Sequence, residues 1–292
     1  MTKLLVTGAA GHLGRRVVEV LIEAKAGEII ATTRSPDKLA DLAARGVDVR
    51  AADFDDRASL DRAFSGAERL LLISTNTLDV PGKRLAQHRN AVAAAVGAGV
   101  RHIAYTSAPA PYPTPESSLI NDHFWTEAAI FGADVDWTIL RDNIYADYTL
   151  PALAHAVASG QLFSATKGGA RNYVSREDCA RAAAGALASA KGRQVFDIGG
   201  TAPVTQDELA AIASELTGRA ITHVNLAPDA LRAGLVQSGL PGFLADALVA
   251  FDVDASEGKH AVRTDAIQAL TGRPPTSLRD FLVEHRSAFS AA

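Results

Sequence analysis

Short apolar runs alternate with longer alanine-rich stretches through the first half of the chain. The apolar runs are rich in leucine and β-branched residues, and they predict strands over residues 3–7, 28–33, 47–51, 69–74, 101–107 and 136–141. The stretches between them predict helices over residues 12–25, 36–45, 57–65, 82–98 and 118–131. This alternation is typical of βαβ units, and it predicts an α/β fold built on a Rossmann-type, doubly wound parallel sheet. Ligands of such sheets bind where the carboxyl ends of the strands meet.

The pattern changes after Arg141. Helices are predicted over residues 150–159 and 176–190, a strand near 172–174, and a further helix that ends at Gly218. Ser175–Asp178 and Thr205–Glu208 have the spacing of capping boxes, and residues 220–226 predict a strand. We therefore expect a Rossmann domain over residues 1–150. A smaller C-terminal α/β lobe over residues 151–292 would pack on its ligand-binding edge as part of one continuous domain.

Composition narrows the class of protein. The chain has 292 residues, 48% of them hydrophobic, and its 29 basic and 33 acidic residues give a net charge of −4, which provides no basic footprint for nucleic acid. Its longest apolar run, Ala91–Val100, has ten residues, whereas a membrane helix needs about 20. Cys179 is the only cysteine of the chain, and the histidines of the chain lack the spacing of metal ligands. We therefore expect a cytoplasmic protein without a disulfide or a metal site.

Three glycines follow the first predicted strand directly. Gly8, Gly11 and Gly14 form a Gly-x-x-Gly-x-x-Gly turn that opens the first predicted helix. Residues without side chains let the backbone approach a pyrophosphate, whose negative charge is favoured at the amino end of a helix. Glycines also mark simple turns, but this position in a βα series favours a dinucleotide site.

The residue after the second predicted strand indicates which dinucleotide is bound. NAD sites commonly place an acidic residue there to bind the ribose 2′-hydroxyl, but this chain has Arg34, followed by Lys38 one helical turn later. A guanidinium suits a 2′-phosphate, so the pattern favours NADP(H). The alternative is a solvated arginine at a strand end, and Asp37 is mildly unfavourable for a phosphate.

Five segments together resemble the NmrA-like family of atypical short-chain dehydrogenase/reductases, and most of all its branch of type 2 NAD(P)H:quinone oxidoreductases and triphenylmethane reductases. They are Val6–Gly14, Leu70–Ser74, Gln87–Asn90, His102–Ser107 and Thr138–Arg141. The resemblance extends over the whole chain. It implies an NADP-binding Rossmann domain and a substrate lobe.

The resemblance also implies roles for individual residues. Gly8–Leu13 would hold the pyrophosphate, Arg34 the 2′-phosphate, and Asp142–Asp147 would cover the nicotinamide. Asp53 and Phe54 would flank the adenine, and Ser74–Asn76 would line the ribose. The full set of candidate cofactor-binding residues is Thr7, Gly8, Ala10, Gly11, His12, Leu13, Gly14, Arg34, Lys38, Asp53, Phe54, Ser74, Thr75, Asn76, Tyr105, Thr106, Ser107, Asp142, Asn143 and Tyr145. Relatives tend to have Asn directly after the Leu-Arg pair, whereas here Asp142 stands before Asn143.

A general acid is missing from its usual place. Many members of the superfamily use Tyr-x-x-x-Lys, but no tyrosine here has a lysine four residues later, and the corresponding segment carries His123 and Glu127 at that spacing. A ketone needs a positioned proton donor when it is reduced, whereas a reduced quinone is a phenolate with a pKa of about 10, like tyrosine. His123 and Tyr145 remain candidate donors, although each could be an ordinary packed or loop residue.

We therefore expect an NADPH-dependent reductase of quinones or similar conjugated acceptors that transfers hydride directly, without a flavin. The alternative is a regulator that binds NADP(H), acts on protein partners and turns nothing over. The sequence does not specify the acceptor or the oligomeric state.

Overall fold

The computed structural model describes residues 1–114 and 118–290, which form two compact units. Unit 1 contains Met1–Arg141, Cys179–Phe196 and Ala269–Gly272, and unit 2 contains Asp142–Asp178, Asp197–Gln268 and the chain from Arg273 onward. The sequence-based division at residue 150 treated both parts as contiguous, whereas the chain crosses between the units several times.

A seven-stranded sheet forms the centre of unit 1, in the order β3-β2-β1-β4-β5-β6-β9. The strands are β1 (Lys3–Val6), β2 (Glu28–Thr33), β3 (Asp48–Ala51), β4 (Arg69–Leu72), β5 (His102–Ser107), β6 (Asp136–Asp142) and β9 (Arg193–Ile198). The first six pair in parallel, which confirms the predicted fold class. The strand order reverses between β1 and β4, and this is the switch point at which such sheets bind ligands.

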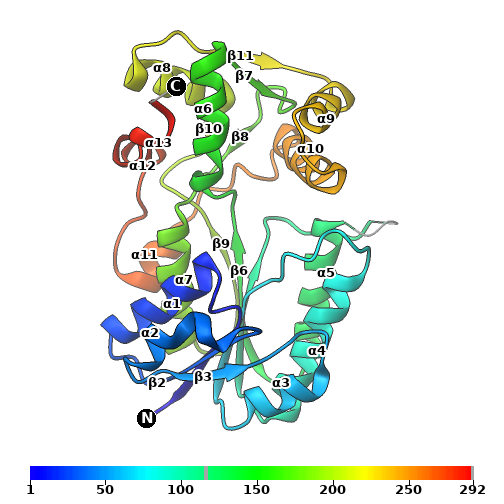
Figure 1. Cartoon of the computed structure of the whole chain (residues 1–292), viewed down its shortest axis with the longest axis vertical. Coiled ribbons are helices and arrows are strands. Elements are labelled where there is room, and N and C mark those ends of the chain that lie inside the picture. The colour runs from blue at the N-terminus through cyan, green and yellow to red at the C-terminus, as the bar shows by residue number, and fades with distance from the viewer. Residues whose placement is uncertain (115–117, 291–292) are drawn as a thin grey trace. The chain divides into compact units, whose positions relative to one another are not determined.

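Helices cover both faces of this sheet (Figure 1). One face carries α1 (His12–Glu23), α2 (Ala40–Ala43) and α7 (Arg176–Ser189), with the 3₁₀ turn η1 (Pro36–Leu39) before α2. The other carries α3 (Arg57–Phe64), α4 (Lys83–Gly97) and α5 (Leu119–Phe131). Under this second layer lies a core that includes Phe64 and Tyr105, both fully buried.

Unit 2 is a mixed α/β lobe with two small sheets. β7 (Gln161–Ser164) pairs in parallel with β11 (Thr222–Asn225), and β8 (Ala170–Arg171) pairs antiparallel with β10 (Val204–Thr205). The predicted capping box at Thr205 is present and begins α8 (Gln206–Thr217). The other elements are η2 (Ala146–Tyr148), α6 (Thr149–Ser159), α9 (Pro228–Gln237), α10 (Gly242–Ser256), α11 (Ala266–Thr271, whose last residues join unit 1), α12 (Leu278–Glu284) and α13 (Ser287–Ser290).

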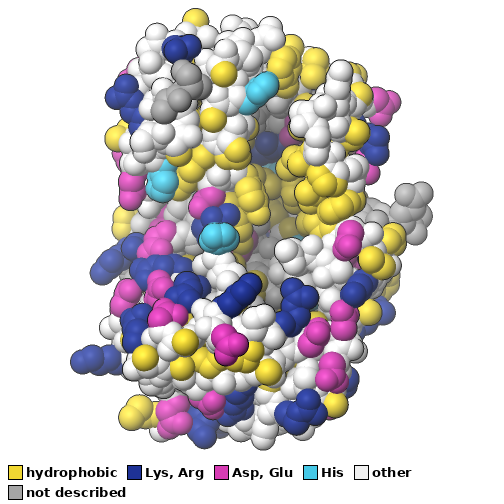
Figure 2. All heavy atoms as spheres, viewed as in Figure 1, with side chains coloured by type: hydrophobic (Ala, Val, Ile, Leu, Met, Phe, Trp, Pro, Cys, Tyr) yellow, Lys and Arg dark blue, Asp and Glu magenta, His cyan; other side chains and the backbone are white. Residues whose placement is uncertain are grey.

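Hydrophobic side chains gather on the surface of unit 2 over α9 and α10 (Figure 2). Val236, Phe243 and Leu248 of these helices are each about 40% exposed. A cluster of exposed apolar side chains often marks a surface that binds an apolar ligand or a partner. No helix within the described ranges is long and apolar enough to cross a membrane.

Candidate cofactor and active site

The glycine turn joins the end of β1 to the start of α1. Gly8 has a φ of +62°, a conformation that favours glycine, and the Gly11 N–H donates to the Gly8 carbonyl oxygen at 2.9 Å. A Cβ on Gly14 would lie 2.4 Å from the same oxygen, whereas a Cβ on Gly11 would meet it at 3.3 Å. Gly14 is therefore required for close packing, while Gly11 is exposed and leaves the backbone open to a ligand.

The amino end of α1 has the features of an anion site. Its N-cap is Gly11, so no side chain caps it, and its first turn contains no acidic residue. Ala10, Gly11 and His12 are exposed there. The first N–H groups of a helix lack intrahelical acceptors and carry a partial positive charge, so a pyrophosphate fits this turn.

Arg34 directly follows β2, and its side chain is exposed. Lys38 is also exposed, and its carbonyl oxygen accepts a hydrogen bond from Arg15, which is itself paired with Asp41 at 2.7 Å. Arg15 is thus occupied by a carboxylate. Arg34 and Lys38 leave positive charge exposed after β2, where a 2′-phosphate could bind.

Three successive backbone N–H groups after β4 are held by side chains from three other elements. Ile73 donates to Thr7 Oγ1, Ser74 to Thr106 Oγ1 and Thr75 to His88 Nε2, each at 2.9 Å. Thr7 and Thr106 are almost fully buried, so these two predicted cofactor residues act on the loop rather than presenting side chains to a ligand. Ser74 and Thr75 are half-buried, and Asn76 is exposed.

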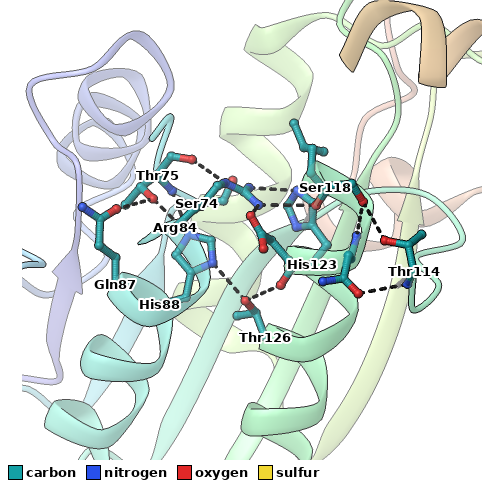
Figure 3. A network of polar contacts seen from close by, with 12 residues as sticks. Ser74, Thr75, Arg84, Gln87, His88, Thr114, Ser118, His123 and Thr126 are labelled. Atoms are coloured by element: carbon teal, nitrogen blue, oxygen red, sulfur yellow. Dashed lines mark hydrogen bonds and ion pairs between the residues drawn. The ribbon is translucent and has the colours of Figure 1, made fainter. Parts of the chain in front are cut away.

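His123 of α5 lies inside the protein (Figure 3), and Tyr105 of β5 is also fully buried. Arg84 can only donate, so His123 Nε2 accepts from it at 3.0 Å, and His123 Nδ1–H donates to the Tyr105 hydroxyl at 2.8 Å. Burial, followed by the charge of Arg84, lowers the pKa of His123 well below its usual range. Both nitrogens of His123 are thus engaged and its ring is neutral, which disfavours it as a proton donor. The Tyr105 side chain belongs to the same buried network.

Ser107 ends β5 and donates to Glu127 Oε1 at 2.6 Å. Arg141 binds both oxygens of this buried carboxylate, at 3.0 and 2.7 Å. The segment in which Tyr-x-x-x-Lys was sought from the sequence therefore holds a buried carboxylate, Glu127, paired with Arg141. Because Ser107 commits its proton to Glu127, its hydroxyl has only lone pairs to offer to a ligand.

Within unit 2, Asp142 and Asn143 are buried and Tyr145 is half-buried. The Tyr145 hydroxyl donates to Asp142 Oδ2 at 3.0 Å. Burial raises the pKa of Asp142 to about 7, and the Tyr145 bond partly opposes this rise. Asn143 is held by its neighbours, since its N–H donates to the Ile198 carbonyl and its side-chain amide to the His260 carbonyl. Tyr145 is the more accessible of the two candidate donors.

Sequence analysis missed several residues of this region. Gln87 and His88 lie in a segment that carries the family resemblance, but neither they nor Arg84 received a binding role, because their contacts to Thr75 depend on where α4 packs. The Glu127–Arg141 pair could have been suspected from the acidic residue four positions after His123. Within residues 1–114 and 118–290, no cluster of three or more histidine, cysteine, aspartate and glutamate side chains could hold a metal ion.

The buried histidines predict a loss of stability in mild acid. Burial, with the charge of Arg84 as the second cause, lowers the pKa values of His88 and His123 in the folded protein, while the unfolded chain titrates near pH 6.5. The unfolded state therefore binds more protons below that pH. We expect the free energy of unfolding to fall from about pH 6.5 downward, by up to about 1.4 kcal/mol per pH unit for each ring.

Urea unfolding between pH 7.5 and 5 measures this slope. Asp142, whose pKa is raised, contributes in the opposite direction, so the informative comparison is between the parent and His88→Gln. The variant lacks one titrating ring and should show the shallower loss. Equal slopes in the two proteins would contradict the assignment.

The glycine turn, the uncapped α1 terminus and the basic residues after β2 define a dinucleotide-binding Rossmann protein. A family model described as NAD(P)H-binding matches residues 8–190, and the chain belongs to this family. Quinone oxidoreductase 2 of Escherichia coli strain K12 is 36% identical over 279 residues, which is 95% of this chain and 96% of that protein.

Solved structures agree with this family. An NADPH-dependent quinone oxidoreductase from Escherichia coli, complexed with NADPH, is 36% identical, has a TM-score of 0.90 and covers 97% of this chain and 99% of its own. The triphenylmethane reductase of Citrobacter sp., complexed with NADP(H), is 34% identical with a TM-score of 0.88, over 96% of this chain and 99% of its own. The expected resemblance and NADP(H) as cofactor are therefore confirmed.

Proposed function

We propose that this protein reduces quinones or similar conjugated acceptors with NADPH, and that hydride passes directly from the nicotinamide to the acceptor. The bound nicotinamide would supply the hydride. The turn at Gly8–Gly14 would hold the pyrophosphate, and Arg34 would bind the 2′-phosphate. The similarity to a quinone oxidoreductase and a dye reductase supports this choice of acceptor.

The observation that carries the proposal is the state of two side chains of α5, His123 and Glu127. His123 is buried with both ring nitrogens engaged, and Glu127 is bound by Arg141, so neither residue of the segment where Tyr-x-x-x-Lys was sought is free to act as a general acid. A quinone tolerates this arrangement because its reduced form is a stable phenolate, which water can protonate. Reduction of an isolated ketone would instead require a positioned proton donor.

NADPH oxidation against a panel of acceptors tests the proposal. The panel contains a benzoquinone, a naphthoquinone, a triphenylmethane dye and an aliphatic ketone, with a control that lacks acceptor. We expect turnover with the quinones and the dye, and almost none with the ketone. A protein that binds NADPH but oxidises it with no member of the panel would support the NADP(H)-sensing alternative instead.

Replacing the candidate donors should have small effects on quinone reduction. An obligatory general acid contributes about 10²- to 10⁴-fold, whereas a phenolate product can take its proton from water. We expect Tyr145→Phe and His123→Ala each to lower kcat for a quinone by less than about 100-fold. Tyr145→Phe is the sharper test, because it keeps the ring and removes only the hydroxyl that binds Asp142.

Steady-state kinetics at saturating NADPH provide the measurement, with NADPH affinity determined separately. A loss of about 1,000-fold in kcat for Tyr145→Phe, with NADPH affinity unchanged, would identify Tyr145 as a dedicated donor. The explanation based on quinone chemistry would then be incorrect.

A further inference from the structure

The polar face of α4 contacts two loops that are far apart in the sequence. One is the loop after β3, Asp53–Asp55, and the other is the loop after β4, Ser74–Asn76. The family resemblance implies that Asp53 and Phe54 flank the adenine of NADPH and that Ser74–Asn76 line its ribose. Gln87, His88 and Asn90 lie in a segment that marks the family resemblance but has had no role in the chemistry so far.

A single side-chain amide joins the two loops. The Gln87 carbonyl oxygen accepts from the Thr75 hydroxyl at 2.8 Å, and its NH₂ group donates to Asp55 Oδ1 at 3.1 Å. The carboxylate can only accept, so these partners fix the orientation of the amide. Lys83 binds the other oxygen of Asp55 at 3.0 Å, and the side chain of Gln87 is buried.

His88 and Arg84 hold the backbone of Thr75 from both sides (Figure 3). The Thr75 N–H donates to His88 Nε2 at 2.9 Å, and the Thr75 carbonyl accepts from Arg84 Nε at 2.7 Å. His88 must then carry its proton on Nδ1, which donates to Thr126 Oγ1 at 2.9 Å. Thr126 in turn donates to the Asp122 carbonyl at 2.6 Å, so α5 fixes the histidine ring in its accepting tautomer.

Asn90 secures the other loop, where its amide donates to the Phe54 carbonyl at 3.0 Å. The α4 residues Gln87, His88 and Asn90 therefore bind Asp55, Thr75 and Phe54, respectively. These contacts leave the two loops little conformational freedom. Less conformational entropy is therefore lost when a ligand binds to the loops.

We propose that Gln87, His88 and Asn90 are positioning residues that hold the β3 and β4 loops in one geometry for the adenosine half of NADPH. The inference rests on the proposed binding of NADPH in this site, with its adenosine half on the two loops as the family resemblance implies. The three α4 residues increase the affinity for NADPH and do not affect hydride transfer. These residues act through Asp55, Thr75 and Phe54.

Binding of NADPH and of adenosine 2′,5′-bisphosphate, measured by calorimetry, tests this role. We expect Gln87→Leu and His88→Leu each to raise both dissociation constants by about tenfold, the equivalent of one lost hydrogen bond. His88→Gln should bind within about threefold of the parent, because its amide oxygen can replace Nε2 as the acceptor. At saturating NADPH, kcat should stay within about twofold while KM for NADPH rises.

His102→Leu is the matched control. His102 is a buried histidine at the amino end of β5, where its Nε2 contacts Thr138 Oγ1 at 2.9 Å, away from both loops. This variant should lose thermal stability much as His88→Leu does, without a change in either dissociation constant. If His102→Leu weakens binding equally, or if both α4 leucine variants bind like the parent, the proposal fails.

Conservative variants keep the test decisive if a leucine variant does not fold. Gln87→Glu retains an acceptor for Thr75 but places a carboxylate against Asp55, so it should weaken binding, whereas His88→Gln should preserve it. Parent-like binding by Gln87→Glu would overturn the proposal. A parent protein that binds NADPH but reduces no acceptor would contradict the proposed function alone, because the measurement here is binding.

Discussion

Gly11→Val is expected to weaken dinucleotide binding by about 100-fold or more and to leave the fold intact. Gly11 is exposed and has an extended backbone with φ −84° and ψ 166°, which valine readily adopts. Its Cβ would lie 3.3 Å from the Gly8 carbonyl oxygen, a tight contact that requires a shift of only a few tenths of an ångström. The branched side chain would nevertheless stand where a pyrophosphate must approach the N–H groups of α1.

The expected loss is large because several contacts are lost together. Each hydrogen bond to a charged group contributes about 1.5 to 3 kcal/mol, so two lost bonds would weaken NADPH binding by about 100-fold or more. Calorimetric titration measures the affinity, and circular dichroism with thermal melting reports the fold. Unchanged affinity in Gly11→Val would show that the glycines form only a structural turn.

Gly14→Val provides the contrast within the same turn. A Cβ at this position would lie 2.4 Å from the Gly8 carbonyl oxygen and 3.0 Å from the Ala9 Cα, so the backbone itself would have to move. We expect this variant to lose thermal stability together with binding. Comparing Gly11→Val with Gly14→Val distinguishes a glycine that lets a ligand approach the backbone from one that lets a neighbouring segment pack closely.

The strands and helices of unit 1 could be predicted because each has one strong local signal. β2 (Glu28–Thr33) was predicted with its observed bounds, and β1 and β6 were each predicted to within one residue. These strands lie inside a parallel sheet, so most of their residues are buried and each strand has adjacent apolar residues that are easily recognised.

Other elements depend on contacts that no local pattern carries. β9 was not predicted, because three of its six residues, Arg193–Val195, are exposed and its sequence alternates weakly. The strand expected near residues 172–174 is β8 (Ala170–Arg171) instead. The N–H groups of Asn172 and Val174 donate to His260 and Ile144, which lie outside any strand, so the ladder stops at Arg171.

The candidate site likewise contains some residues that local sequence features locate and others whose placement depends on packing. The glycine turn and Arg34 are local features, fixed by a strand end and the residues that follow it, and they could be located from the sequence. The directions in which the side chains of Tyr105, Thr106 and His123 point could not be predicted from the sequence. Tyr105 and His123 meet between β5 and α5, and this meeting depends on helix packing rather than on spacing along the chain.

Arg34→Ala is expected to remove the preference for NADPH over NADH. The two cofactors differ by the 2′-phosphate, and Arg34 is exposed at the end of β2, where this group is bound in the Rossmann fold. One charge-assisted hydrogen bond contributes about 1.5 to 3 kcal/mol, so the parent should bind NADPH roughly 10- to 150-fold more tightly than NADH. In Arg34→Ala the ratio should approach one, chiefly because NADPH binds more weakly, with NADH affinity almost unchanged.

Arg45→Ala is the matched control, since it removes the same charge from an exposed arginine just before the amino end of β3. Its affinity ratio should equal that of the parent. Lys38→Ala should reduce the ratio by less than Arg34→Ala does, because a lysine acts as a point charge without the planar fork that grips a phosphate. Raising the salt concentration should lower the ratio in the parent far more than in Arg34→Ala, because exposed charges are screened. Equal affinity of the parent for NADPH and NADH would exclude Arg34 as the residue that selects the cofactor.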